Sequence, residues 1–137
     1  MDIGNLVSIR YALPVAVFDQ RPVIGGTTVR FASGSETFTD LGSRTRESPD
    51  PGEVVFIDAA GLVSARRWCW RQSLESASDP DTSEILVTVE GHHDGAAADV
   101  AAAVRDLEAL LDAHVGPVAS TSAMLDRDIR TFDGLPA

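Results

Sequence analysis

Near the middle of the chain stands the segment RRWCWRQS (residues 66–73), which holds three of the eleven basic residues and both tryptophans. Guanidinium and indole groups interleaved at this density can stack on planar groups and form paired hydrogen bonds with phosphates or carboxylates. The same pattern is also typical of a strand with tryptophan on one face and arginine on the other. The composition of the segment is compatible with either interpretation.

The residues before this segment predict a β-hairpin. The unbroken apolar middle of residues 53–58 predicts a central strand buried on both faces. A tight turn is expected over residues 59–61, and residues 62–70 are expected to form the partner strand. Strict alternation divides that strand between two faces, with Ala65, Arg67 and Cys69 on one and Arg66, Trp68 and Trp70 on the other.

Two arrangements follow from this hairpin. In the structural one, the tryptophans fill the core and the arginines are solvated or pair with carboxylates. In the functional one, the strand faces a ligand: Arg66, Arg67 and Arg71 hold an anionic group, and Trp70 packs on a ring. Thr88 and Glu90 lie two positions apart on the strand predicted over residues 85–90, so they would share a face and could recognise a polar group of that ligand.

The other elements are predicted from periodicity and turn residues. Leu6, Ile9 and Leu13 recur at helical spacing, and Val100, Val104, Leu107 and Leu111 form an apolar stripe on a second helix that Asp94 could cap. The expected elements are a helix over 2–13, a strand over 15–19, a hairpin over 27–32 and 37–41, a loop over 42–52, a helix over 96–114, and a tail over 118–137.

The predicted fold class is α/β in the broad sense (α+β). A mixed or mainly antiparallel sheet is expected with flanking helices, of which the long one lies near the C-terminus. The length of 137 residues predicts one domain. No stretch is long and apolar enough to span a membrane, and no signal peptide is visible, so no membrane association is expected.

Charge and cysteine content narrow the function classes. The formal net charge is −10 and every basic residue is arginine. Such acidity disfavours sequence-independent binding to a phosphate backbone, although a local basic patch can still bind one. Cys69 is the single cysteine, so no internal disulfide can form, and a reducing, cytoplasmic location is expected.

The common signatures of catalysis and cofactor binding are missing from the sequence. His92 and His93 with Asp94 could be metal ligands, but adjacent histidines seldom reach one ion and no further Cys or His cluster completes a site. We therefore interpret them as a solvated loop and expect no metal and no cofactor. Cys69, between two tryptophans, is interpreted as a small buried side chain rather than a nucleophile.

Four blocks of the sequence, in order, resemble the B3/B4 tRNA-binding and editing domain of the phenylalanyl-tRNA synthetase beta subunit. The resemblance is stronger to free-standing relatives of that domain, whose ARRW-x-WRQ-S segment is matched almost letter for letter. It spans roughly residues 6–90. The four blocks are YALPVAVFD (11–19), GTTVRFA (26–32), PGEVVFID (51–58) and ARRWCWRQS (65–73).

The resemblance implies an α/β fold and a role in editing. In the synthetase, this domain hydrolyses tyrosine wrongly attached to phenylalanine tRNA, using a strand glutamate that recognises the tyrosine hydroxyl and a histidine in a Pro-x-His-x-Phe-Asp pattern. Here Ala16 stands at the histidine position, and Thr88 stands at the glutamate position with Glu90 two residues later. The editing apparatus of the synthetase is therefore not carried over intact.

The resemblance also suggests the partners. Free-standing relatives carry a further N-terminal portion, and this chain resembles the C-terminal two-thirds of the domain. The expected partner is tRNA or aminoacyl-tRNA. If the protein is an enzyme, it is expected to be an aminoacyl-tRNA deacylase, a hydrolase. The alternative is an inactive module that binds a free amino acid or small molecule. Either a homodimer or a second chain that supplies the missing portion would complete the pocket.

Overall fold

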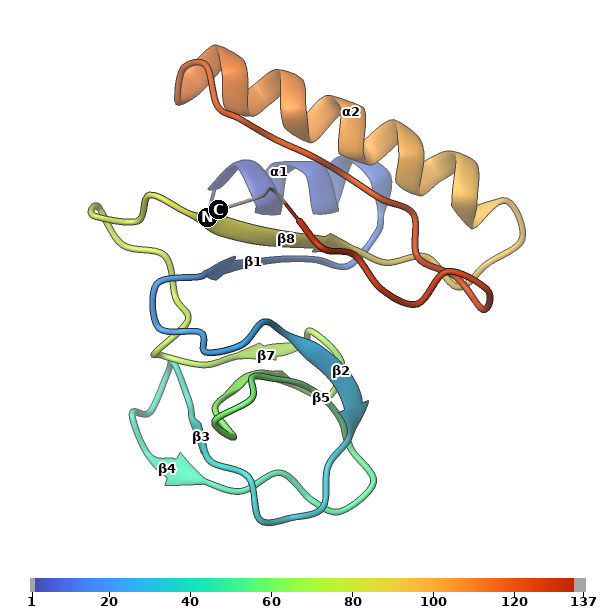
Figure 1. The fold of residues 1–137 in the computed structure, drawn as a ribbon. Coiled ribbons are helices and arrows are strands. Elements are labelled where there is room, and N and C mark those ends of the chain that lie inside the picture. The colour runs from blue at the N-terminus through green and yellow to red at the C-terminus, as the bar shows by residue number, and fades with distance from the viewer. Residues whose placement is uncertain (1, 135–137) are drawn as a thin grey trace. The chain divides into compact units, whose positions relative to one another are not determined.

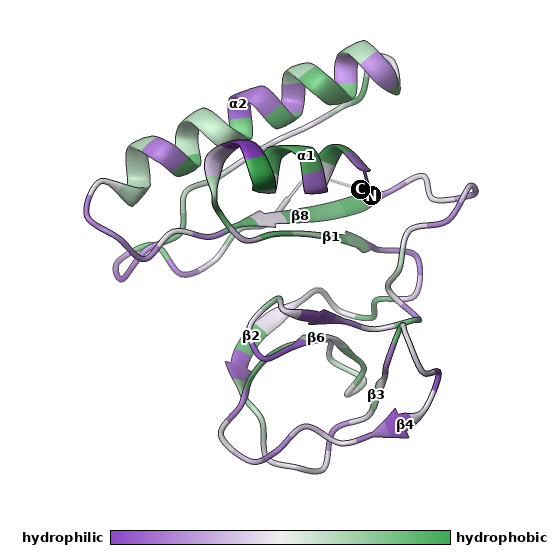
Figure 2. Cartoon of the chain, turned by 180° about the vertical axis from the view of Figure 1, so that it is seen from behind, coloured by the Kyte–Doolittle hydropathy of each residue, from purple (hydrophilic) through white to green (hydrophobic). Residues whose placement is uncertain are grey.

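The computed structural model describes residues 2–134, and the chain divides into two compact units. We call Pro14–Thr88 the strand unit. The helical unit consists of Met1–Leu13 together with Val89–Ala137. Figure 1 and Figure 2 together label the elements of both units.

The strand unit contains a four-stranded antiparallel sheet in the order β2-β5-β6-β7. Two further pairs accompany it: β1 with β8, and β3 antiparallel to β4. Together with two helices, these sheets confirm the predicted α+β class with mainly antiparallel pairing. The strands are β1 (Val15–Asp19), β2 (Thr28–Phe31), β3 (Phe38–Thr39), β4 (Arg46–Glu47), β5 (Val54–Ile57), β6 (Val63–Arg66), β7 (Arg71–Gln72) and β8 (Ile85–Val89).

Strand β5 is central, as its apolar run predicted. Val55 and Ile57 belong to one buried cluster, which also contains Phe38. Phe56, between them, points to a second cluster around Phe18, whose ring centroid lies 5.5 Å from that of Phe56. Successive side chains of a strand point to opposite faces, so an unbroken apolar run has to be covered on both sides.

The predicted hairpin between residues 27–32 and 37–41 is wrong, because β2 pairs with β5 and β3 pairs with β4. The cause is the buried carboxylate of Glu36. It accepts hydrogen bonds from the backbone N–H groups of Ser33 (2.8 Å) and Gly34 (2.9 Å) and from Arg30 Nη1 (2.6 Å). The Ser33 N–H contributes most to holding the pKa of Glu36 far below its usual value. These bonds fix a turn without strand pairing.

The loop predicted over residues 42–52 is not wholly irregular. Strand β4 lies within it, and Pro49 is fully buried. The loop also carries Glu47, and Glu53 follows directly after it. Both carboxylates turn toward Arg66. Ion pairs with Arg66 therefore hold residues 42–53 in place, although their polar composition predicted a solvent-exposed loop.

In the helical unit, α1 (Asp2–Tyr11) packs against α2 (Ala96–His114), and the two helices run side by side in Figure 1. An ion pair joins Arg10 to Asp106. Both helices were predicted from their periodicity. In α2 the apolar stripe is buried at Val100 and Leu107, and the two colours of Figure 2 alternate along this helix.

The predicted cap of α2 is wrong in one detail. Gly95, rather than Asp94, occupies the N-cap position, with φ of 86° and no side-chain cap. This left-handed φ is favourable for glycine, which explains why Gly95 rather than Asp94 stands at the cap although the helix begins at Ala96 as predicted. No helix in residues 2–134 has the length and apolar character required to cross a membrane.

Residues 118–134 contain no helix or strand and extend along α2 (Figure 1). Met124 and Ser122 line a hollow together with Val100 and Val104 of that helix. Within the segment, the carboxylate of Asp126 accepts hydrogen bonds from the backbone N–H groups of Asp128 (2.7 Å) and Ile129 (2.8 Å). These N–H groups lower the pKa of Asp126.

Candidate functional site

The segment over residues 66–73 is a tight turn between two short strands rather than a continuous strand. Strand β6 ends at Arg66, and residues 67–70 form the turn. Arg67 and Trp68 have φ of 53° and 60°. The predicted strand is therefore wrong beyond Arg66, and so is the alternation of faces through Trp70. Left-handed conformations cost non-glycine residues about 1–2 kcal/mol each, so the surrounding structure has to hold the turn in place.

Two backbone hydrogen bonds hold the turn, one to the neighbouring strand β5 and one inside the turn. The Trp68 N–H donates to the Val54 carbonyl at 3.1 Å, and the Trp70 N–H donates to the Arg67 carbonyl at 3.3 Å. The first bond extends the contact between β5 and β6 beyond the last residue of β6. The turn is thus attached to the central strand of the sheet.

Arg66, at the start of the turn, is buried among carboxylates. Its side chain is 4% exposed. Nε donates to Glu53 Oε1 at 3.0 Å, Nη1 donates to Glu47 Oε1 at 2.8 Å, and Nη2 also pairs with Glu53. The hydrogen bonds with Glu53 raise the pKa of Arg66 and lower that of Glu53. This arginine is therefore already engaged with protein carboxylates.

Arg71, at the end of the turn, lies opposite Arg66 in the register of β6 and β7. Both guanidinium carbons lie 5.6 Å from the centroid of the buried Phe38 ring, within the range of cation–π contact. Arg71 Nη2 pairs with Asp40 and lies 3.1 Å from Glu47 Oε1. The N–H of Gly42 and then Arg71 hold the pKa of Asp40 below its usual value. Shared carboxylates thus allow the two cations to lie close together.

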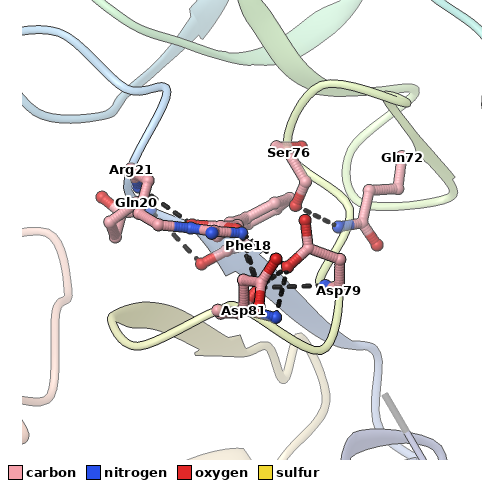
Figure 3. Close-up of polar contacts among 9 residues, drawn as sticks. Phe18, Gln20, Arg21, Gln72, Ser76, Asp79 and Asp81 are labelled. Carbon is pink, nitrogen blue, oxygen red and sulfur yellow. Dashed lines mark hydrogen bonds and ion pairs between the residues drawn. The ribbon is translucent and has the colours of Figure 1, made fainter.

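The last residues of the segment attach it to its neighbours. Gln72 Nε2 donates to the Val17 carbonyl at 2.7 Å and to the Ser76 carbonyl at 3.0 Å, and the second bond is visible in Figure 3. The hydroxyl oxygens of Ser73 and Ser76 lie 3.0 Å apart in a fully buried position. Arg71, Gln72 and Ser73 therefore have structural contacts in the strand unit.

The middle of the segment, in contrast, projects into solvent. The exposed fractions are 56% for the Arg67 side chain, 49% for Trp68 and 82% for Trp70. Between them, Cys69 is half-buried and packs against the cluster of Phe18 and Phe56, as expected for a small apolar side chain. The structural arrangement considered from the sequence is thus reversed, since Arg66 is buried and the tryptophans are exposed.

Thr88 and Glu90 were predicted to share one face of a strand. Thr88 lies within β8 in the strand unit, and Glu90 follows that strand in the helical unit. Each has a buried oxygen, Thr88 Oγ1 and Glu90 Oε1, with no hydrogen-bond partner among residues 2–134. Such atoms are uncommon in folded proteins, and a bound polar group or water would satisfy them.

Of the predicted site residues, the structure brings four together: Arg67 and Trp70 lie in one turn, and Arg66 and Arg71 flank it.

The histidine loop forms separate pairs. His92 Nε2 lies 3.5 Å from Glu90 Oε2, and His93 Nε2 lies 2.8 Å from Asp99 Oδ2. Within the described part of the chain, no group of three His, Cys, Asp or Glu side chains is arranged to hold a metal ion.

A second polar cluster, which the sequence interpretation missed, lies at the end of β1. Arg21 Nε donates to both oxygens of the buried Asp19, at 3.1 and 2.9 Å, and Nη2 donates to Asp79 Oδ1 at 2.7 Å (Figure 3). The hydrogen bond from Arg21 is the largest cause of the strongly lowered pKa of Asp19. The only signal in the sequence was an aspartate that ends an apolar run two residues before an arginine.

This cluster borders a hollow of about 430 Å³ that Leu74 and Glu75 also line. Thr39 Oγ1 donates to Glu75 Oε1 at 2.5 Å, and Thr82 Oγ1 donates to Asp19 Oδ2 at 2.7 Å. Arg21 thus pairs with Asp79 of the loop over residues 79–82 and with Asp19 of β1, and so attaches that loop to the strand. We interpret this cluster as structural.

Comparison with known proteins assigns the chain to a family. Residues 1–107 match the family described as the B3/4 domain. The chain is 33% identical over 87 residues to the phenylalanine–tRNA ligase beta subunit of Bradyrhizobium diazoefficiens. That match covers 64% of this chain and 10% of the ligase subunit. The chain therefore spans about a tenth of the length of this relative.

Proposed function

Because the chain belongs to the B3/4 domain family, we propose that it binds aminoacyl-tRNA, with the turn over residues 67–70 against the RNA. The observation that carries this proposal is the exposure of Trp70 and Arg67 on a turn whose two ends are fixed by buried contacts. A rigid turn that presents an indole and a guanidinium loses little conformational entropy when it binds a ligand.

The arginines of the segment have different roles in this proposal. Arg67 contacts the RNA, because its side chain is mostly solvated and its ion pair with Glu53 is loose, at 3.6 Å. Arg66 and Arg71 hold the turn in its projecting conformation through Glu47 and their other carboxylate partners. Arg66 and Arg71 thus support RNA binding without touching the RNA.

Thr88 and Glu90 are proposed to recognise the amino acid carried by the RNA. Their unsatisfied buried oxygens support this assignment, since a hydroxyl or ammonium group could donate a hydrogen bond there. The resemblance implies that Thr88 stands at the position that recognises the amino-acid side chain, and Glu90, two residues later, would supply a carboxylate. The relation of the chain to a synthetase subunit supports aminoacyl-tRNA as the partner.

A second candidate is a module that binds a free amino acid without RNA. The observation in its favour is Ala16, which stands where the resemblance implies a histidine. Ala16 is buried in an apolar cluster and has no group that could transfer a proton. The formal net charge of −10 points in the same direction, because it disfavours RNA.

A binding assay with charged and uncharged phenylalanine tRNA tests the proposal. We expect tyrosyl-tRNA to bind more tightly than the uncharged form. Glu90→Gln should lower the ratio of these two affinities roughly tenfold, as expected for the loss of one charge-assisted hydrogen bond. Glu84→Gln, an exposed site in the strand unit, is the matched control. Failure of every charged tRNA to bind would contradict the proposal. Stabilisation by a free amino acid alone would favour the second candidate.

A further inference from the structure

The exposed turn has an aromatic neighbour that no sequence signal identified. Phe31, the last residue of the edge strand β2, is 72% exposed. Trp68 and Trp70 are 49% and 82% exposed. Large aromatic side chains normally account for much of the buried area of a small core. Exposure of three of them in one small unit therefore indicates a binding surface.

Backbone contacts place Phe31 beside the turn. Phe31 pairs with Val54 in the β2–β5 ladder, and the Val54 carbonyl accepts the hydrogen bond of the Trp68 N–H. Phe31 and Trp68 therefore flank the same residue of the central strand. Two strand spacings correspond to roughly 10 Å between their backbones. The two residues are therefore close enough to contribute to one binding surface.

One cation of this surface is available for a ligand. Arg67 directly precedes Trp68 in the turn, and its Nε is 3.6 Å from Glu53 Oε1, too far for a hydrogen bond. The nearby Arg30 is already engaged, because its Nη1 donates to Glu36 at 2.6 Å and to the Phe31 carbonyl at 2.8 Å. The surface thus offers several aromatic faces and one guanidinium.

We propose that Phe31, Trp68 and Trp70 form a stacking surface for unpaired RNA nucleotides, with Arg67 contacting one phosphate. The inference rests on the proposed function for the identity of the ligand as RNA. Every base has a flat aromatic face, so stacking on exposed rings binds single strands without reading their sequence. Base pairing hides these faces, and a duplex should not bind here.

This arrangement accounts for RNA binding by an acidic protein. A chain with net charge −10 cannot rely on phosphate neutralisation, so the bases have to supply most of the affinity. One phosphate contact through Arg67 corresponds to a slope of about −0.7 for the logarithm of the binding constant against that of the salt concentration. A protein that bound mainly through phosphates would show a much steeper slope.

The two tryptophans give the experiment its readout, since both lie in the proposed surface. The full chain is titrated with a single-stranded RNA oligonucleotide that ends in CCA while tryptophan fluorescence is followed. We expect quenching by the single strand and none by the same oligonucleotide in a duplex. Phe31→Leu should weaken the affinity roughly tenfold, as expected for the loss of one stacking partner. The matched control is Phe132→Leu, an exposed site in the helical unit.

The outcomes separate this inference from the proposed function. The stacking surface is overturned if the single strand causes no quenching, if the duplex quenches equally, or if Phe31→Leu binds as tightly as the wild type. If tRNA binds in a separate filter assay while fluorescence stays constant, the proposed function stands and this inference fails. If quenching occurs without preference for charged tRNA, the inference stands and the recognition of the amino acid fails.

Discussion

Arg66→Ala is expected to lower the free energy of unfolding by about 3–5 kcal/mol, the usual effect of removing one partner of a buried ion pair. The side chain of Arg66 is 4% exposed, and that of Glu53 is 14% exposed. Removal of the guanidinium leaves Glu53 without its main partner, and Glu47 loses a hydrogen bond of 2.8 Å. The mostly buried charge of Glu53, more than the lost contacts, accounts for the expected loss, since Glu47 keeps its ion pair with Arg71.

Urea unfolding of three variants measures this effect. Arg66→Lys keeps the charge but loses the forked geometry, so an intermediate loss is expected. Arg67→Ala removes an equal charge from a side chain that is 56% exposed, and we expect a change within about 0.5 kcal/mol. A change below about 1 kcal/mol for Arg66→Ala would show that the carboxylate cluster does not hold the turn.

Phe18→Ala should cost about 3–5 kcal/mol of unfolding free energy, because it removes a large ring from the core and leaves a cavity. Phe18 is fully buried, and its ring packs 5.5 Å from that of Phe56. The exposed Phe31 provides the matched control, since Phe31→Ala makes the same chemical change at a site with 72% exposure. Equal losses for the two variants in urea unfolding would contradict the assignment of the core.

The sequence predicted those elements whose pattern is set by burial. The apolar run of β5 required cover on both faces, and the structure provides it through separate clusters around Phe38 and Phe18. The periodic stripe of α2 predicted a helix with the same bounds, Ala96–His114. Both patterns follow from the geometry of regular elements, so a single sequence is sufficient to identify them.

The sequence did not predict structure that depends on a side chain holding the backbone. Arg67 and Trp68 have left-handed backbones without being glycine, so residue type gave no signal for a turn there. The false hairpin over residues 27–41 has a similar origin, because the carboxylate of Glu36 shapes that turn from a buried position. Periodicity detects strands and helices, but it does not show which polar side chain will bond to the backbone.

The sequence singled out the candidate site only at the level of the segment. Composition marked residues 66–73 as unusual, but it could not distinguish the roles of Arg66 and Arg67. The difference arises from carboxylates at positions 47 and 53, which lie far from the segment in sequence and meet Arg66 only in the fold. Phe31 reaches the site through the pairing of β2 with β5, which the sequence interpretation assigned differently.

The central claim is that buried contacts at both ends of the turn over residues 67–70 hold it in place to bind RNA. The affinity of the Arg67→Ala variant for tyrosyl-tRNA tests this claim most directly. We expect weaker binding, a salt slope that is shallower by about 0.7 because the single phosphate contact is lost, and unchanged stability. Arg46→Ala removes the same charge from an exposed site of the same unit and should bind as the wild type does. Wild-type affinity and salt slope for Arg67→Ala would contradict an RNA contact by this turn.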